Sequence, residues 1–184
     1  MQLAVKRIIF FISVFLLWEL LIRVMSVPAV VLPAPSDIFL SLKESVADGT
    51  LFRDLSASFF RLFIGLLLAL FIGSALGILL AKSKTADETL GSVILALQSI
   101  PSIVWLPLAI MWFGLNEKAV IFIVILGGAI VMTINVRTGL KNISPIYIKA
   151  AQTMGSKGLD LFFRVMLPAS VPYFVTGTRL AWAF

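Results

Sequence analysis

The sequence contains neither cysteine nor histidine. Without cysteine the chain has no disulfide framework and no thiolate to serve as nucleophile or metal ligand. Without histidine it lacks the commonest general base, the commonest transition-metal ligand and a frequent proton-relay group. A phosphate-binding loop of the form G-x-x-x-x-G-K-[ST] is absent as well. We therefore expect no metal site and no cofactor in this chain, and we expect its energy or chemistry to come from elsewhere.

Charged residues are also scarce. They make up 13% of the 184 residues, whereas hydrophobic residues make up 60% and the mean hydropathy is +1.09. Soluble domains are about a quarter charged. The composition predicts an all-α, polytopic transmembrane helical bundle. The net charge of +6 is spread along the chain, which indicates membrane topology rather than nucleic-acid binding.

Apolar runs long enough to cross a membrane divide the chain. A helix needs about 20 mostly apolar residues to cross the hydrocarbon core. We expect a single transmembrane domain over residues 1–184. The predicted spans are residues 8–25, 59–81, 90–115, 119–140 and an incomplete 169–184, in which we expect the chain to stop inside a fifth helix.

The first span has an alternative reading as a cleaved signal peptide. Glu19 and Arg23 interrupt its apolar run, and no A-x-A cleavage site follows. Their i,i+4 spacing allows them to pair on one helix face, so a retained span is favoured. In the polar connection that follows, Ser36 or Asp37 is predicted to cap a short helix.

Two spans contain features that point to packing or to a solute path. Gly73-x-x-x-Gly77 predicts a helix face that another helix approaches closely. The third span contains two prolines, which break a helix and survive in a membrane only where protein or a water-lined cavity satisfies the freed groups. Simple helix packing is an equally good explanation for each residue taken singly. The candidate translocation path consists of Gln98, Ser99, Pro101, Ser102 and Pro107.

The distribution of basic residues predicts the orientation. Cytoplasmic loops of membrane proteins carry an excess of lysine and arginine. With the N-terminus inside, nine basic residues are cytoplasmic and five lie on the other side. We therefore expect a cytoplasmic N-terminus, and the segment of residues 144–168, which follows four spans, is then cytoplasmic too.

Residues 144–168 form an amphipathic, glycine-broken segment between apolar runs. Ser144 is predicted to cap a helix with Pro145 in its first turn, and Gly155 to adopt the left-handed conformation after its end. Tyr147, Ala150, Ala151 and Met154 then share one face. This face either packs on the protein's own bundle or the membrane surface, or it contacts a partner protein.

The spacing of this segment carries a resemblance to a known family. The pattern Ala150-Ala151-x-x-x-Gly155, nine residues, then Val165-x-Leu167-Pro168 resembles the "EAA" signature of binding-protein-dependent ABC importer permeases. Lys149 stands where the family has glutamate, and Val165 replaces isoleucine. The stretches "VLPAPSDIF" and "SIPSIVWLPLAIMWFGL" are similar to the branch that imports sulfonates, taurine or nitrate. The resemblance covers the chain from about Val30 onward.

The resemblance implies a permease subunit of a bacterial inner-membrane importer, with about six helices when complete. Its partners would be a separate ATPase that binds ATP and Mg²⁺, a second permease copy, a solute-binding protein and the lipid bilayer, but not nucleic acid. The segment of residues 144–168 would be a coupling helix seated in the ATPase. Lys149 is then either a solvated residue or the partner of an acidic residue on the ATPase. The implied coupling residues are Tyr147, Lys149, Ala150, Ala151, Met154, Gly155, Val165, Leu167 and Pro168.

Other classes of membrane protein remain as alternatives. An ion-gradient-driven transporter or channel subunit often needs buried acidic or histidine relays, and only Glu19 lies within a predicted span. A purely structural subunit is a second alternative. An intramembrane enzyme is disfavoured because the sequence offers no nucleophile or metal constellation. The transported solute and the choice between a homodimer and a heterodimer stay open.

Overall fold

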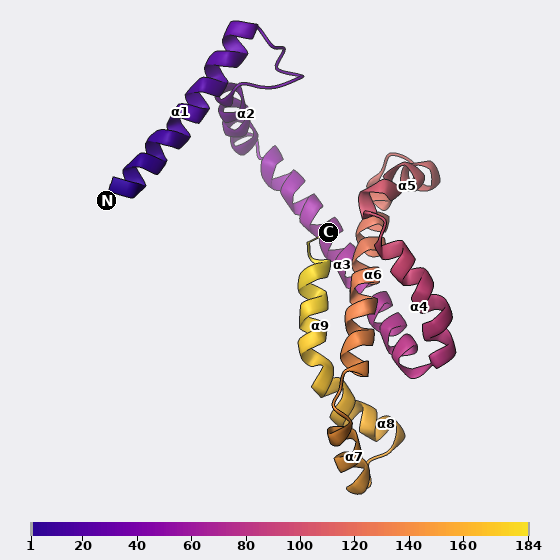
Figure 1. Ribbon diagram of the computed structural model, residues 1–184. Coiled ribbons are helices and arrows are strands. Elements are labelled where there is room, and N and C mark those ends of the chain that lie inside the picture. The colour runs from indigo at the N-terminus through magenta and orange to yellow at the C-terminus, as the bar shows by residue number, and fades with distance from the viewer. Residues whose placement is uncertain (1, 184) are drawn as a thin grey trace. The chain divides into compact units, whose positions relative to one another are not determined.

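The computed structural model describes residues 2–183, with side chains from residue 3 onward. Every regular element in that range is a helix, as Figure 1 shows. A short 3₁₀ segment, η1, and a π-helical segment, η2, join the α-helices. The elements are α1 (Gln2–Met25), α2 (Pro35–Ala47), α3 (Thr50–Lys82), α4 (Lys84–Gln98), η1 (Ser102–Trp105), α5 (Leu106–Phe113), α6 (Glu117–Lys141), α7 (Pro145–Thr153), α8 (Gly158–Leu161), η2 (Phe162–Met166) and α9 (Leu167–Ala181).

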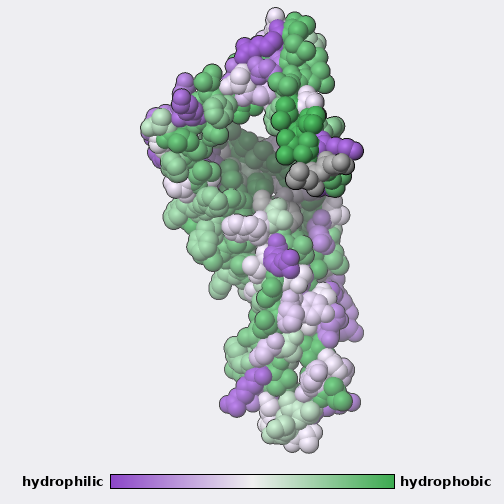
Figure 2. Space-filling view, turned by 90° about the vertical axis from the view of Figure 1, so that its left-hand side faces the viewer, coloured by the Kyte–Doolittle hydropathy of each residue, from purple (hydrophilic) through white to green (hydrophobic). Residues whose placement is uncertain are grey.

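Several helices are long and apolar enough to cross a membrane. Four qualify singly, and one bent pair of helices makes a fifth if its two arms count as one span. The single helices are Leu3–Met25, Thr50–Lys82, Glu117–Lys141 and Gly158–Ala181. Hydrophobic side chains cover most of the face in Figure 2, a surface that suits lipid rather than water. The predicted all-α polytopic fold is therefore confirmed, and the protein is a multi-pass membrane protein.

The chain forms two compact units, Met1–Ser58 and Phe59–Phe184. The boundary falls within α3. Each unit has its own internal contacts and is described by itself below. The expectation of one permease domain over residues 1–184 stays a prediction.

In the first unit, polar contacts join the end of α1 to the start of α2. Glu19 and Arg23 form the predicted ion pair, with 3.0 Å between Arg23 Nε and Glu19 Oε1. Ser36 donates both its backbone N–H (3.1 Å) and its hydroxyl (2.9 Å) to Glu19. Asp37 accepts the N–H of Ala34, the residue before the helix, at 3.3 Å. Ser36 therefore ties α2 to α1 instead of capping it, and Asp37 satisfies the helix start from inside the first turn.

In the second unit, α6 is the central helix and glycines set how closely its neighbours approach. A Cβ on Gly73 would lie 2.6 Å from the Met132 Cβ, and one on Gly77 would lie 2.7 Å from the Thr133 carbonyl oxygen. Neither distance is possible for real side chains, so only glycine permits this approach of α3 to α6. The prediction of close packing at this pair of glycines is confirmed. Gly139 of α6 contacts Tyr173 of α9 in the same way.

The third predicted span, residues 90–115, is not one straight helix. The helices Lys84–Gln98 and Ser102–Phe113 meet at an angle of 94°. The break falls at Pro101, which has no backbone N–H to donate and restricts Ile100 to extended conformations. Pro107 makes no second kink. It lies in the first turn of α5, where a proline costs no helical hydrogen bond.

The predicted boundary between the segment of residues 144–168 and the last span is also not a helix break. The chain is helical from Gly158 through Ala181, so the end of the 144–168 segment and the last predicted span belong to one helix that continues across Pro168. The π-helical segment Phe162–Met166 ends two residues before Pro168. Its wider turn rearranges the hydrogen bonds that a proline cannot complete, so the helix continues into α9.

Candidate functional site: a cavity at a helix break and an exposed helical segment

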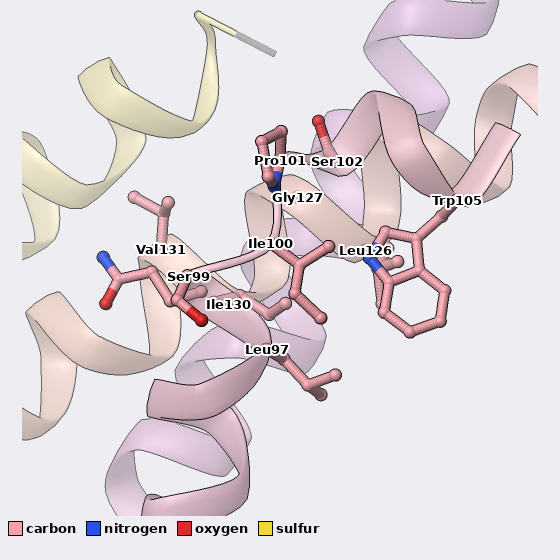
Figure 3. A pocket seen from close by; sticks show the side chains of 11 residues that line it. Leu97, Ser99, Ile100, Pro101, Ser102, Trp105, Leu126, Gly127, Ile130 and Val131 are labelled. Carbon is pink, nitrogen blue, oxygen red and sulfur yellow. The ribbon is translucent and has the colours of Figure 1, made fainter.

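A cavity of about 200 Å³ lies at the break between α4 and η1. Residues of the break form one side of it, and one stretch of α6 forms the other (Figure 3). The lining residues are Leu97, Gln98, Ser99, Ile100, Pro101, Ser102, Trp105, Leu126, Gly127, Ile130 and Val131. The proline break thus creates a space beside the middle of α6 that a continuous helix would fill.

Four of the five predicted path residues lie together in this lining. Gln98, Ser99, Pro101 and Ser102 all face the cavity, whereas Pro107 is absent from it. Sequence reasoning did not place the α6 stretch here, because its apolar residues look like those of any buried span. Trp105, which the third span also contains, contributes an aromatic wall.

The polar groups of the cavity carry no net charge. The lining contains no lysine, arginine, aspartate or glutamate. The Ser99 hydroxyl donates to the Ala96 carbonyl at 2.6 Å. Within the described range, no hydrogen bond uses the Gln98 amide or the Ser102 hydroxyl. A small solute here would therefore be held by neutral hydrogen-bonding groups and by apolar contact.

The second candidate site is the segment of residues 144–168. Its first helix, α7, ends in two hydrogen bonds of the Schellman pattern: Gly155 N–H to Gln152 O (3.0 Å) and Ser156 N–H to Ala151 O (3.0 Å). Gly155 has a φ of +91°, which glycine adopts without strain. The predicted helix and glycine terminator are confirmed. Ser144 precedes the helix, but its side chain makes no cap bond, so that detail was wrong.

One side of α7 is anchored and the other is open. Ile148 packs on a buried cluster that contains Ile143 and Phe162. Tyr147 is 63% exposed and Met154 is 88% exposed, with Ala150 exposed between them. Part of the predicted face is therefore not covered by the described residues of this chain.

The other predicted coupling residues vary in exposure. Ala151, Val165 and Leu167 are half-buried, whereas Lys149, Gly155 and Pro168 are exposed. The turn between the two short helices is fixed by Asp160, which accepts the Ser156 hydroxyl at 2.6 Å and pairs with Arg164 at 2.6 Å. Lys149 forms no ion pair with any described residue.

Sequence reasoning missed a cluster of charges that joins α4 to α6. Asp87, in the first turn of α4, pairs with both Arg137 and Lys141 near the end of α6, and the Arg137 Nη2 lies 3.0 Å from Asp87 Oδ2. The Asp87 side chain is only 13% exposed. The one available signal was that Asp87 follows the second predicted span and Lys141 follows the fourth, so alternating spans bring both to the same side of the membrane. Among the described residues, no group of acidic side chains suits a metal ion.

The fold and these two sites define a class: a polytopic helical membrane protein with a cavity at a helix break and an exposed, anchored helix between two spans. The chain belongs to the family of binding-protein-dependent transport system inner membrane components, whose pattern matches residues 63–184. The predicted membership of the ABC importer permeases is confirmed. The chain is accordingly a transport component and not an enzyme.

Individual relatives support the same assignment. A protein named as an ABC transporter permease of Methanocaldococcus jannaschii is 34% identical over 90% of this chain and 65% of its own length. The protein of Bacillus subtilis named as the aliphatic sulfonates transport permease SsuC is 32% identical over 90% of this chain and 60% of its own. The nitrate import permease NrtB of Leptolyngbya laminosa is 34% identical over 76% and 50%. The chain thus spans about half to two thirds of these relatives.

Proposed function

We propose that this protein is the permease subunit of an ATP-binding-cassette importer and that residues 144–168 couple it to a separate ATPase, which binds ATP and Mg²⁺. The observation that carries the proposal is the open face of α7. Tyr147 and Met154 expose large apolar side chains around Ala150, and small residues flanked by larger ones let a partner's backbone approach closely. Exposed apolar groups on a polar connection favour a protein contact.

The anchoring of α7 provides a route from that contact to the cavity. Ile148 and Phe162 pack with Leu140 and Ile143 at the end of α6. The same helix lines the cavity through Leu126 to Val131. A movement of α7 would therefore displace α6 as a rigid element. At ~1.5 Å per residue, the cavity-lining part of α6 that begins at Leu126 lies about 20 Å along the helix from Leu140, and its displacement would change the shape of the cavity.

A co-purification tests the coupling. The complete permease is expressed with its candidate ATPase, and association and stimulated ATP hydrolysis are measured. We expect Ala150→Glu with Ala151→Glu to abolish association, because two charges would be buried against the partner. The matched control is Gln152→Glu, which adds a charge to an exposed position away from the face. Association that survives the double substitution contradicts the proposal.

The energy source is tested separately in vesicles that contain the assembled transporter. We expect uptake to require ATP and to persist when an uncoupler removes the ion gradient. Uptake that stops with the uncoupler while ATP remains high would instead favour an ion-gradient-driven transporter.

We propose that Lys149 faces an acidic residue of the ATPase. Its exposure and its lack of an ion partner among described residues leave the ammonium group available. Lys149→Glu is then expected to weaken association and to reverse its dependence on salt, whereas Lys149→Gln weakens it less. Equal association of all three proteins would identify Lys149 as a solvated residue.

We propose that the cavity is part of the solute path, with Gln98 and Ser102 as hydrogen-bond donors, and that the solute is a small anion such as a sulfonate, taurine or nitrate. The names of two relatives, which specify aliphatic sulfonates and nitrate, support an anion. Competition uptake with these three solutes and an uncharged heterocycle tests the class. Gln98→Leu is expected to lower uptake with association to the ATPase unchanged, and preferential uptake of the heterocycle would overturn the solute class.

We propose further that the N-terminus is cytoplasmic, that the protein resides in a bacterial inner membrane, and that it works as a homodimer with a solute-binding protein outside. The distribution of basic residues supports the orientation. Because the chain has no cysteine, single cysteines at Ser83 and Ser45 can be labelled with an impermeant reagent. Labelling of Ser45→Cys alone from outside intact cells is expected, and the reverse pattern would invert the topology.

A further inference from the structure

The short helix α2 has two faces of opposite character. Ile38, Phe39, Leu42 and Val46 recur at helical spacing and form an apolar stripe about 100° wide, as in an amphipathic helix. Each of the four is between 43% and 68% exposed. The opposite face carries Asp37, Ser41 and Glu44, with Leu40 as the one large apolar residue among them. No residue of α2 is buried. The apolar stripe is therefore not covered by its own unit, and something outside that unit must shield it from water.

The position of α2 directly after a membrane-length helix indicates that the lipid bilayer shields the stripe. Leu3–Met25 is a membrane-length apolar helix, and only 6% of its apolar window is buried, which suits a helix that spans the bilayer. The first turn of α2 is tied to the last turns of α1 through Ser36 and Asp37, which contact Glu19 and Arg23. The apolar stripe therefore starts at the level where α1 leaves the hydrocarbon core.

Length and charge exclude a position across the membrane. Thirteen residues make a helix of about 20 Å at ~1.5 Å per residue, shorter than the ~30 Å core. The carboxylates of Asp37 and Glu44 on one face would be costly among acyl chains. Lys43 lies at the border of the stripe, where a lysine extends its ammonium group toward lipid phosphates.

We propose that α2 lies in the plane of the bilayer interface, at the membrane face where α1 ends, with its apolar stripe among the lipid acyl chains and its acidic face in water. The lipid bilayer is the occupant of this surface. The polar contacts of Glu19 and Arg23 with Ser36 and Asp37 set the angle at which the chain turns from the span into the interface. This proposal depends on α1 spanning the membrane and not on the proposed coupling to an ATPase.

Site-directed nitroxide labelling tests the proposal, and the cysteine-free sequence provides the background. The purified protein carries one cysteine at a time, Phe39→Cys or Leu42→Cys on the stripe and Ser41→Cys or Glu44→Cys on the opposite face. Two positions on each face keep the test valid if one variant does not fold. Each labelled protein is placed in bilayers of zwitterionic and anionic lipids. Collision of the label with oxygen, which concentrates in lipid, is compared with collision with a water-soluble nickel complex.

We expect the ratio of oxygen to nickel accessibility to be several-fold higher at Phe39→Cys and Leu42→Cys than at Ser41→Cys and Glu44→Cys. Equally low ratios at all four positions would overturn the proposal because α2 would then be fully in water, and equally high ratios would overturn it because both faces would then lie in lipid. Immobile labels on the stripe that neither reagent reaches would also overturn it, because a protein surface, such as a second copy or a solute-binding protein, would then cover the stripe.

Discussion

The two units of this chain are stabilised in different ways. In Phe59–Phe184, α6 buries Met132, Thr133 and Val136 against its neighbours, and glycines allow backbones to approach. In Met1–Ser58, the buried apolar residues among those described are Ile22 and Ala34, and the specific contacts are polar. Small-residue packing therefore stabilises the second unit, and side-chain hydrogen bonds and ion pairs shape the first.

The difference shows how apolar residues are distributed in a membrane protein. Lipid covers an apolar surface as well as another helix does, so hydrophobicity alone does not bring helices together. Packing in the second unit depends on shape, and glycine is essential to it. Among the described residues of the first unit, the one glycine, Gly49, has no neighbour within 4 Å, and most of the large apolar side chains are exposed. Four substitutions break or sharpen this comparison, from the largest expected effect to the smallest.

The largest effect is expected from a side chain placed between α3 and α6. Gly73→Leu puts a Cβ 2.6 Å from Met132 Cβ and 2.7 Å from the Ala129 carbonyl oxygen, and the backbone cannot move aside locally. We expect the free energy of unfolding to fall by about 3 kcal/mol, at the upper end for overpacking. Thermal unfolding of the purified protein in detergent measures the change.

The matched control is Ala75→Leu, because Ala75 lies on the exposed face of the same helix. That substitution is expected to change the free energy of unfolding by less than about 0.5 kcal/mol. Equal losses of unfolding free energy for the two variants would show that the glycine contacts do not stabilise the second unit.

The next effect concerns the charges that join α4 to α6. Asp87→Asn leaves Arg137 and Lys141 without their carboxylate, and a largely buried pair that loses one partner is destabilised. We expect a loss of about 1–3 kcal/mol, because the arginine and lysine remain partly solvated. Glu88→Gln is the control, since Glu88 is 65% exposed and its Lys84 contact is 3.7 Å. If Asp87→Asn is as stable as Glu88→Gln, the charge cluster does not stabilise the packing of α4 on α6.

The sequence predicts the elements of this fold better than their long-range polar contacts. The Gly73–Gly77 face and the helix that ends at Gly155 were predictable because each depends on residues within one or two turns. Asp87 and Arg137 are 50 positions apart, and no local pattern states which acidic residue meets which basic one. The continuous helix through Pro168 was missed for a related reason. A π-helical segment is an adjustment to packing, and no sequence pattern predicts it.

The candidate sites divide in the same manner. Gln98, Ser99, Pro101 and Ser102 stand close in sequence, so the proline break alone brings them together. The residues of α6 opposite them are ordinary apolar residues, and only the packing of α6 against the break selects them. The α7 face was predictable from its spacing, but its exposure depends on Ile148 being the residue that packs inward.

A smaller effect is expected in the first unit. Glu19→Gln weakens the contacts that Glu19 makes with Ser36 and Arg23, so the start of α2 should separate from α1 more often. We expect the hydrogen-exchange protection of the first turns of α2 to fall several-fold, with the second unit unchanged. Glu44→Gln is the control, because Glu44 lies on the exposed polar face of α2. Unchanged protection in Glu19→Gln would mean that these contacts do not hold the turn.

The smallest effect concerns the junction between α2 and α3. The Thr50 hydroxyl (2.6 Å) and backbone N–H (2.9 Å) both donate to Asp48, and these two bonds lower the pKa of Asp48. A carboxyl whose pKa is lower in the folded state stabilises the fold above its unfolded pKa of about 3.9. That contribution is lost as the pH falls through the folded pKa.

Thr50→Val removes the hydroxyl and leaves the N–H. Hydrogen-exchange protection of the first turn of α3 is measured at several pH values and corrected for the intrinsic exchange rate. We expect lower protection than in the unmodified protein at neutral pH, and a difference that shrinks toward zero in acid. Ser56→Ala is the control, because its hydroxyl donates to the Arg53 carbonyl (2.8 Å), which does not titrate. The loss of protection caused by Ser56→Ala should not change with pH. If the loss caused by Thr50→Val is equally independent of pH, the Asp48 charge does not stabilise the junction.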